Sequence, residues 1–329
     1  MTDTESCLIM GAGIAGLLAA QRLVRYDLEV TLIEKNAIPG GRMSIRKEGE
    51  AVFDTGAQFM TTRDMIFRER VESWLTKGET LPWYPGPLKN MRYVGSRGMT
   101  TVTDRIASDL NVRLSETVTR LRRTKTKWKV TTQKTDSGEK MNYEADWLVL
   151  TAPVPLNMRL LDDSGIEIDF DDEDELRKIS YMPCLAAMAH LNGPSGLPNP
   201  GAMDLNHSVL RWIGDNHMKG ISPVPGTVTF HSSRQFAEAN WDKPDDEWMA
   251  AMLAAAKPFI KSDVVSATSR KWLYSDPTRI FMEKHPFRKS YYLDEDLQLG
   301  MAGDGFGGAR IEAAGLSGME LASAIISPI

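Results

Sequence analysis

The stretch LIMGAGIAGLLAA (residues 8–20) is the most informative part of the sequence for the fold. An apolar run stops at the pattern Gly11-x-Gly13-x-x-Gly16 and then resumes with leucine and alanine. This pattern predicts a buried strand, a tight turn and an amphipathic helix. Gly11 permits the sharp turn, and Gly13 lets a pyrophosphate approach the backbone. Gly16 lets the helix pack closely on the strand, with the N–H groups of its first turn facing the phosphates.

A second apolar segment, LEVTLI (residues 28–33), predicts a strand that ends at Glu34. A carboxylate there accepts hydrogen bonds from an adenosine ribose and repels a 2′-phosphate, so we expect an NAD-like or FAD-like ligand rather than NADP. Close packing alone is the other explanation of the glycines. The two strands, the helix and the acid at the expected spacing favour the dinucleotide site.

Length and composition limit the remaining possibilities. A chain of 329 residues predicts two lobes, and its ordinary composition with a net charge of −5 gives no sign of a nucleic-acid partner. The basic run 120–129 is interpreted as the solvated face of a hairpin. Cys7 and Cys184 form neither a metal-ligand pattern nor a disulfide framework, so we expect no metal and a reducing, cytoplasmic location. No run is long enough for a membrane span, and a cleaved signal peptide would remove the glycine pattern.

Periodicity and turn residues predict further elements. We expect a helix over 62–81, broken by the proline-rich run 82–87, and a helix over 101–109. Residues 162–175 are interpreted as a solvated acidic surface. The segments 112–114, 118–122, 128–132 and 141–144 predict an antiparallel meander. Further strands are expected over 147–150, 184–191, 209–213 and 228–233, a helix over 249–256, a hairpin from 291–293 and 297–302, and a last helix around 316–322.

The segment Gly40-Gly41-Arg42 follows the predicted ribose-binding acid. It resembles the Gly-Gly-Arg motif of the flavin amine oxidase superfamily. The resemblance implies that the glycine backbone and Arg42 support the FAD pyrophosphate and ribityl chain, for which the guanidinium fork is suited. A Pro-Gly-Gly turn with a solvated arginine is the alternative.

Residues 52–59 (VFDTGAQF) and 270–277 (RKWLYSDP) resemble segments of renalase-like proteins. There the first segment passes close to the isoalloxazine ring, so Gln58 can offer its amide to the ring or to the substrate. Trp272 can flank either one. His231, on a predicted strand, is a candidate pocket residue. A common Asp-Thr-Gly turn, a core tryptophan and a structural histidine are the alternative interpretations.

A predicted strand ends at Gly303-Asp304 and leads through glycines into a helix. FAD-binding folds use such an aspartate for the ribityl or pyrophosphate region, and the helix start favours the electron-rich edge of a reduced flavin. Asp304 can also serve as a helix cap. Together with Gly98-Met99 and residues 212–219, these motifs resemble a bacterial renalase-like FAD-dependent oxidoreductase of the amine oxidase superfamily.

The resemblance implies an α/β fold. It has a Rossmann-type FAD-binding domain and a discontinuous sheet-and-helix substrate domain, similar to p-hydroxybenzoate hydroxylase or to amine oxidases. We expect the FAD-binding domain to comprise 1–60, 96–158 and 270–329, and the substrate domain to comprise 61–95 and 159–269.

The implied activity is hydride transfer to flavin N5 from a small reduced substrate, an isomeric 2- or 6-dihydronicotinamide form of NAD(P)H, followed by reoxidation with O₂ to H₂O₂. FAD is expected to be non-covalent, because no cysteine follows Cys184. We expect a monomer with no membrane partner. An FAD-dependent amine oxidase or desaturase, and a non-enzymatic binding protein on the same fold, remain the alternatives.

Gln58, Trp272 and His231 are the candidate catalytic residues, although the flavin carries the chemistry. The candidate cofactor-binding residues follow the motifs and the resemblance: Gly11, Ala12, Gly13, Ile14, Ala15, Gly16, Glu34, Lys35, Gly41, Arg42, Met43, Thr55, Gly56, Ala57, Gln58, Val118, Thr151, Ala152, Trp272, Gly303, Asp304, Gly305, Arg310 and Ile311.

Overall fold

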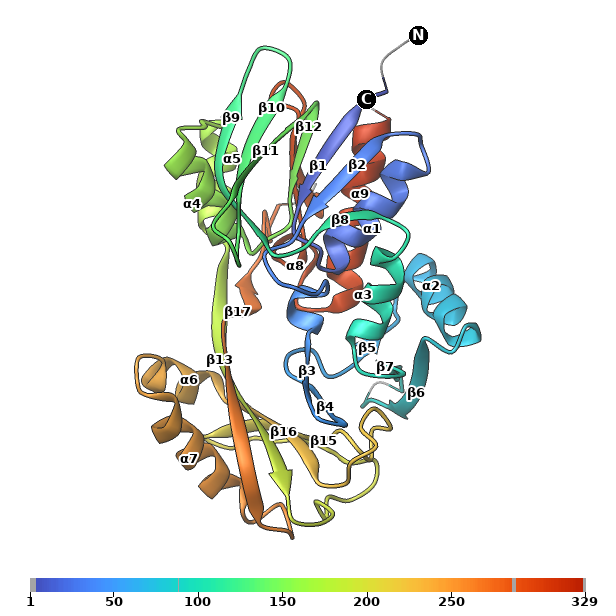
Figure 1. The fold of residues 1–329 in the computed structure, drawn as a ribbon, viewed down its shortest axis with the longest axis vertical. Helices are drawn as coiled ribbons and strands as arrows, with labels where there is room; N and C mark the ends of the chain where they lie inside the picture. The colour runs from blue at the N-terminus through green and yellow to red at the C-terminus, as the bar shows by residue number, and fades with distance from the viewer. Residues whose placement is uncertain (1–3, 88, 286–287, 328–329) are drawn as a thin grey trace. The chain divides into compact units, whose positions relative to one another are not determined.

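The computed structural model describes residues 4–87, 89–285 and 288–327, and the chain forms two compact units (Figure 1). Unit 1 consists of the chain up to Gly41, Thr103–Ser180 and the chain from Pro277 onwards. Unit 2 consists of Arg42–Val102 and Tyr181–Asp276. The predicted boundaries separate an FAD-binding domain from a substrate domain, and that assignment stays a prediction.

Unit 1 is built on a sheet with the strand order β18-β19-β12-β1-β2-β8. All its strands run parallel except β18, which pairs antiparallel with β19. Nearly continuous apolar runs suit strands that are covered on both faces, and β12 and β19 are buried along their whole length. The strands are β1 (Ser6–Met10), β2 (Glu29–Ile33), β8 (Asn111–Arg113), β12 (Trp147–Leu150), β18 (Tyr291–Asp294) and β19 (Leu299–Ala302).

Two helices of unit 1 approach each other closely. A Cβ atom built at Gly318 of α9 (Ile311–Ile326) would lie 2.1 Å from the carbonyl oxygen of Ala15 in α1 (Ile14–Val24). The close approach therefore requires glycine at this position. The remaining helices with residues in unit 1 are α3 (Thr100–Ala107), which begins in unit 2, α4 (Val154–Ser164), α5 (Phe170–Arg177) and α8 (Asp304–Gly307).

The predicted meander is confirmed for three of its segments and wrong for the first. The strands β9 (Glu116–Arg123), β10 (Trp128–Lys134) and β11 (Lys140–Ala145) pair antiparallel. Residues 111–113 instead pair parallel with β2 in the main sheet. A strand of three residues has too little alternation to reveal its partner, and the crossover through α3 delivers it to the edge beside β2.

Unit 2 contains a sheet with the order β14-β15-β16-β13-β17. Its core includes the buried side chains Phe230, Trp248 and Met252. The strands of this sheet are β13 (Ser180–Leu191), β14 (Ala202–Asp204), β15 (Leu210–Asp215), β16 (Thr227–Ser232) and β17 (Val264–Arg279). The other elements are η1 (Gly41–Met43) at the junction of the units, β3 (Ile45–Glu48), β4 (Ala51–Asp54), β5 (Met60–Thr61), β6 (Thr80–Pro85), β7 (Met91–Gly95), α2 (Met65–Thr76), α6 (Arg234–Asn240) and α7 (Asp245–Ala256).

The helix predicted over 62–81 is shorter than expected. It starts after Asp64, whose carboxylate accepts hydrogen bonds from the N–H groups of Ile66 and Phe67, and it ends at Thr76. The chain then enters β6 at Thr80. The other predicted helices, strands and the last hairpin are confirmed within a few residues. The acidic segment 162–175 lies largely at the surface, with Asp169 capping α5.

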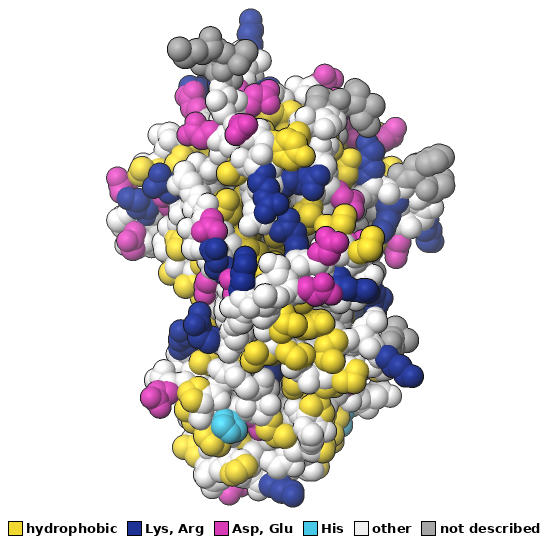
Figure 2. Space-filling view, turned by 90° about the vertical axis from the view of Figure 1, so that its right-hand side faces the viewer, with side chains coloured by type: hydrophobic (Ala, Val, Ile, Leu, Met, Phe, Trp, Pro, Cys, Tyr) yellow, Lys and Arg dark blue, Asp and Glu magenta, His cyan; other side chains and the backbone are white. Residues whose placement is uncertain are grey.

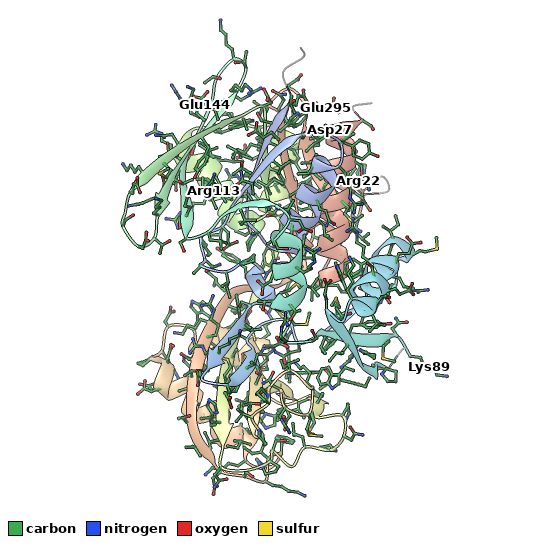
Figure 3. The ribbon with its side chains drawn as sticks, turned by 45° about the vertical axis from the view of Figure 1, so that its right-hand side comes forward. Arg22, Asp27, Lys89, Arg113, Glu144 and Glu295 are labelled. Carbon is green, nitrogen blue, oxygen red and sulfur yellow. The ribbon has the colours of Figure 1, made fainter. Side chains whose placement is uncertain are left out.

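Charged side chains of both signs lie among hydrophobic ones on the face shown in Figure 2. Asp27, Glu144 and Glu295 are exposed on unit 1 (Figure 3). Over the residues that the structure describes, no helix is long and apolar enough to cross a bilayer.

Candidate functional site

Four turns of unit 1 share the carboxyl edge of the parallel strands. The glycine loop follows β1, Glu34 follows β2, Thr151 follows β12, and Gly303 follows β19. Parallel strands present their carboxyl ends at one edge, which is where open α/β sheets bind ligands. The predicted dinucleotide-binding loop therefore lies at the edge where sheets of this type bind ligands.

The three motif glycines have different surroundings. A Cβ atom built at Gly16 would lie 2.1 Å from the carbonyl oxygen of Gly11, and Gly11 itself has φ +106° with Thr151 Oγ1 at 2.7 Å from such an atom. At Gly13 a Cβ atom would meet nothing within 4 Å. Gly11 and Gly16 are thus required by packing, and Gly13 leaves open space beside the first turn of α1.

Glu34 is tied to the glycine loop. Its side chain is buried, and Oε2 accepts a hydrogen bond of 3.0 Å from the N–H of Ala12. Oε1 accepts from the backbone and side-chain nitrogens of Asn36, at 2.9 and 2.6 Å. These bonds fix the carboxylate next to the loop that it was predicted to complement.

A second glycine turn lies against the first. Gly40 donates a hydrogen bond of 2.8 Å to the carbonyl oxygen of Ala12, and a Cβ atom at Gly41 would lie 3.7 Å from the Cα of Gly13. Both residues have positive φ, which favours glycine. Arg42 begins unit 2, where its Nη1 donates to the carbonyl oxygens of Tyr274 and Ser275 at 3.1 and 2.9 Å.

A third glycine turn contains Asp304. Gly303 has φ +143°, its N–H donates to Ser317 Oγ at 2.8 Å, and a Cβ atom there would lie 3.9 Å from the carbonyl oxygen of Thr151. Asp304 is the first residue of α8 and is 7% exposed. Three separate glycine turns thus meet at one edge of unit 1.

Three other predicted cofactor residues of unit 1 take no part in these hydrogen bonds through their side chains. Lys35 and Arg310 are exposed, and Val118 on β9 is half-buried. Across the described ranges, none of these three side chains makes a hydrogen bond to the glycine loop. Their contribution to cofactor binding stays a prediction.

In unit 2 the three predicted catalytic residues meet on one loop, residues 54–58. Trp272 Nε1 and His231 Nε2 both donate to the carbonyl oxygen of Thr55, at 3.0 and 3.2 Å. Burial, aided by the positive charge of Arg211, lowers the pKa of His231 to about 4. His231 is therefore neutral at physiological pH and acts here as a hydrogen-bond donor to the backbone.

Gly56 at the tip of this loop is also held closely. A Cβ atom there would lie 2.2 Å from the carbonyl oxygen of Arg42, which accepts a hydrogen bond of 2.9 Å from the N–H of Ala57. Trp272 Cζ2 would lie 3.3 Å from the same Cβ atom. The glycine permits the loop to sit directly on the Arg42 backbone.

The side-chain amide of Gln58 forms hydrogen bonds with other residues of unit 2. Nε2 donates to the carbonyl oxygens of Asp54 and Gly56 at 2.7 and 3.1 Å, and Oε1 accepts from Lys219 Nζ at 2.8 Å. An amide nitrogen carries two protons, and both are bound within the chain. The amide that was predicted to face the ring or the substrate thus serves the loop itself in this structure.

Sequence reasoning missed Asp54 and Lys219 as site residues. Asp54 Oδ2 lies 2.9 Å from Lys219 Nζ, and both side chains are fully buried. Burial raises the pKa of Asp54 and lowers that of Lys219, and the pairing opposes both shifts. Both residues lie in segments quoted for the resemblance, but nothing in the local pattern indicated that they meet.

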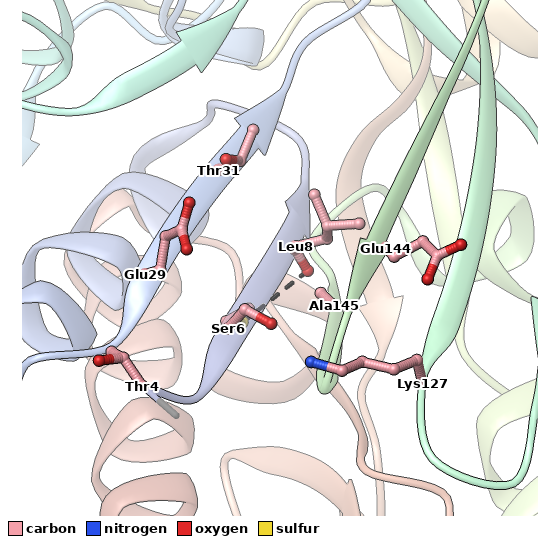
Figure 4. Close-up of a pocket in the computed structure, with 9 residues that line it drawn as sticks. Thr4, Ser6, Leu8, Glu29, Thr31, Lys127, Glu144 and Ala145 are labelled. Carbon is pink, nitrogen blue, oxygen red and sulfur yellow. Dashed lines mark hydrogen bonds between the residues drawn. The ribbon is translucent and has the colours of Figure 1, made fainter. Parts of the chain in front are cut away.

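A hollow of about 420 Å³ lies at the opposite edge of the sheet (Figure 4). It is lined by Ser6 and Glu29 at the amino ends of β1 and β2, and by Lys127. Ser6 Oγ and Lys127 Nζ both donate to Asp146, at 2.7 and 3.0 Å. Ser6 and Lys127 thus bond to another residue of the chain. The hollow is separate from the glycine turns, which lie at the carboxyl edge of the sheet.

Two family models match the chain. Residues 9–70 match an NAD(P)-binding Rossmann-like domain, and residues 76–326 match the flavin containing amine oxidoreductase family. The chain belongs to this amine oxidoreductase family. Membership confirms the predicted fold and the predicted cofactor, FAD. The finer resemblance to renalase is not among these findings.

Curated proteins match a short stretch of the chain, and a solved structure matches its fold. The chain is 37% identical over 62 residues to phytoene dehydrogenase of Streptomyces griseus and 42% identical over 67 residues to hydroxyneurosporene desaturase of Rubrivivax gelatinosus. These matches cover 19% and 20% of this chain but only 12% and 13% of the relatives' lengths. A putrescine oxidase variant aligns with a TM-score of 0.73 at 15% identity, over 98% of this chain and 99% of that one.

Proposed function

We propose that the chain is an FAD-dependent oxidoreductase that removes a hydride from a carbon of a small organic substrate, as an oxidase or desaturase. The observation that carries the proposal is the convergence of the glycine loop, the Gly40–Gly41 turn and the Gly303–Asp304 turn at one edge of unit 1. Family membership supports it, and so do the amine oxidase and desaturase relatives.

The residues at this edge fit a dinucleotide. Gly13 leaves open space where a pyrophosphate must approach, and the first turn of α1 offers N–H groups without intrahelical partners. Glu34 and Asp304 would hold the ribose and the ribityl region. When bound, FAD supplies a two-electron acceptor for a hydride.

The chain's own residues in unit 2 act by positioning. The loop 54–58 is fixed by Trp272, His231 and Lys219, and His231 is neutral at physiological pH. We propose that this loop contacts the flavin, as the resemblance implies. A substrate that gives up a hydride without a proton would need no general base among these groups.

A second candidate, oxidation of a dihydronicotinamide, has one specific observation in its favour. The Arg92 guanidinium lies 4.1, 4.7 and 5.7 Å from the ring centroids of Phe59, Tyr84 and Trp212. Lys219 Nζ lies 5.1 Å from the centroid of Trp83. The chain's own cations thus occupy aromatic faces that would otherwise attract an ammonium substrate, which favours a neutral or anionic one.

Anaerobic reduction separates the two candidates. FAD-loaded protein is mixed with a panel of primary amines and polyamines, with 2- and 6-dihydronicotinamide isomers of NADH and NADPH, and with ordinary NADH, and the visible flavin absorbance is followed. Bleaching by an amine alone supports the amine oxidase activity and rejects the dihydronicotinamide candidate. Bleaching by the isomers alone does the reverse. Bound FAD that no hydride donor bleaches, including desaturase substrates, would contradict the proposal.

A further inference from the structure

We propose that Lys219 is a positioning residue whose ion pair with Asp54 fixes the loop 54–58 and the orientation of the Gln58 amide. The effect on catalysis rests on the proposed function, in which this loop contacts the flavin. The effect on the loop does not depend on it.

The chemistry of the three side chains permits one arrangement. An ammonium group only donates hydrogen bonds, so the oxygen of the Gln58 amide must face Lys219 Nζ. The amide nitrogen then points to the carbonyl oxygens of Asp54 and Gly56. Lys219 therefore selects one of the two amide orientations, and this orientation pulls the tip of the loop towards Asp54.

Asp54 forms hydrogen bonds with three further residues besides Lys219 and Gln58. Its Oδ1 accepts a hydrogen bond of 2.8 Å from the N–H of Met99, and its N–H donates to Asn216 Oδ1 at 3.3 Å. Its carbonyl oxygen accepts from Thr229 Oγ1 at 3.1 Å. Lys219, Gln58, Asn216, Thr229 and Met99 are all buried residues of unit 2, so the pair is the centre of a continuous polar network.

Burial makes the pair sensitive to the loss of either member. Neither side chain is exposed, so water and salt do not screen the charges. Removal of Lys219 alone would leave a buried carboxylate without its counter-ion, whereas removal of both charges avoids that penalty. The double variant leaves no unpaired buried charge but still lacks the hydrogen bond from Lys219 to Gln58 Oε1. It therefore separates the effect of the unpaired charge from the effect of losing this bond.

The test compares Lys219→Met, Asp54→Asn and the double variant Asp54→Asn/Lys219→Met with the wild type. Hydrogen–deuterium exchange of peptides covering residues 54–59 is measured on the full chain without added FAD. We expect about tenfold faster exchange of this loop in Lys219→Met and in the double variant, because neither holds Gln58 Oε1. The double variant is expected to melt closer to the wild type than Lys219→Met does.

The FAD-loaded proteins then provide a second readout. We expect the anaerobic rate of flavin reduction, and kcat, to fall about tenfold in the double variant with a smaller change in KM, because a misplaced loop affects the reacting geometry more than binding. Arg234→Met is the matched control, since it breaks an exposed pair of 2.7 Å with Glu238 in the same unit. It should change neither readout.

A double variant with wild-type exchange in the loop and wild-type kcat would overturn the proposal and leave the pair a purely structural feature. A wild-type protein that binds no FAD would instead contradict the proposed function, and the exchange measurement would still decide the role of Lys219 in the loop.

Discussion

The indole Nε1 of Trp272 donates a hydrogen bond of 3.0 Å to the carbonyl oxygen of Thr55. The two residues are 217 positions apart in the chain. The bond joins β17 to the loop that follows β4, and the same carbonyl oxygen accepts from His231. The loop is thus held from two strands of the large sheet of unit 2.

Replacement of Trp272 by phenylalanine tests this bond. We expect Trp272→Phe to lower the free energy of unfolding by about 1–2 kcal/mol, since the N–H donor is lost and a smaller aromatic ring takes the place of the indole. Urea denaturation measures the change. Trp241→Phe is the control, because it makes the same substitution at a half-buried tryptophan of unit 2 whose indole N–H makes no hydrogen bond within the described residues. Equal losses in both variants would show that the bond to Thr55 contributes nothing.

The glycine loop offers a pair of matched substitutions. Gly16→Ala places a methyl group against the Gly11 backbone and should destabilise the protein by about 1–3 kcal/mol. Gly13→Ala meets no protein atom, and its φ of −76° suits alanine, so stability should stay within about 0.5 kcal/mol of the wild type.

Although Gly13→Ala should leave stability almost unchanged, it should lower the affinity for FAD. We expect Gly13→Ala to weaken FAD binding about tenfold or more, because the methyl group occupies the approach of the pyrophosphate. Fluorescence titration with FAD measures this. Wild-type affinity in the Gly13→Ala variant would place the pyrophosphate elsewhere.

Gly318 tests the packing of α9 on α1. Alanine normally stabilises a helix interior relative to glycine by about 0.5–1 kcal/mol. Here the added Cβ atom would lie 2.1 Å from the Ala15 carbonyl oxygen, so we expect Gly318→Ala to reverse the sign and cost about 1–3 kcal/mol. Thermal or urea unfolding decides the sign. A stabilised variant would mean that the helices separate at no cost.

His231 predicts a dependence of stability on pH. Its pKa is about 4 in the folded protein against about 6.5 when unfolded, so the unfolded state binds more protons between these values. Stability attributable to His231 is complete above pH 6.5 and is lost as the pH falls towards 4. From pH 7.5 to 5 we expect a loss of about 2 kcal/mol.

Replacement of His231 isolates this contribution. In His231→Gln the drop in unfolding free energy between pH 7.5 and 5 should be smaller by about 2 kcal/mol than in the wild type. Urea denaturation at both pH values gives the comparison. An identical drop in the two proteins would show that His231 takes up its proton without cost to the fold.

The sequence allowed much of unit 1 to be predicted. Its strands are short apolar runs, and the positions of the turns after β1, β2 and β19 followed from the rule that parallel strands end at one edge. The segment 111–113 was misassigned because three residues carry no usable periodicity. The end of α2 was misplaced because the predicted helix was extended to the proline-rich run 82–87, whereas the helix ends at Thr76 and β6 begins at Thr80.

Unit 2 was less accessible to sequence reasoning. Lys219 and Asp54 are 165 positions apart, and their pairing depends on the folding of two separate segments against each other. A lone lysine in a turn has the same local pattern whether it is solvated or fully buried. The orientation of the Gln58 amide follows from its bond to the buried Lys219, and the neutrality of His231 follows from the burial of His231 itself, so no local signal could reveal them.

We expect one FAD to bind at the carboxyl edge of unit 1. Purified protein is loaded with FAD, freed of excess cofactor by gel filtration, and its visible spectrum and released flavin are measured in parallel with the Gly13→Ala variant. We expect close to one FAD per wild-type chain and a much lower content in the variant. A colourless wild-type protein, or equal flavin content in both proteins, would contradict it.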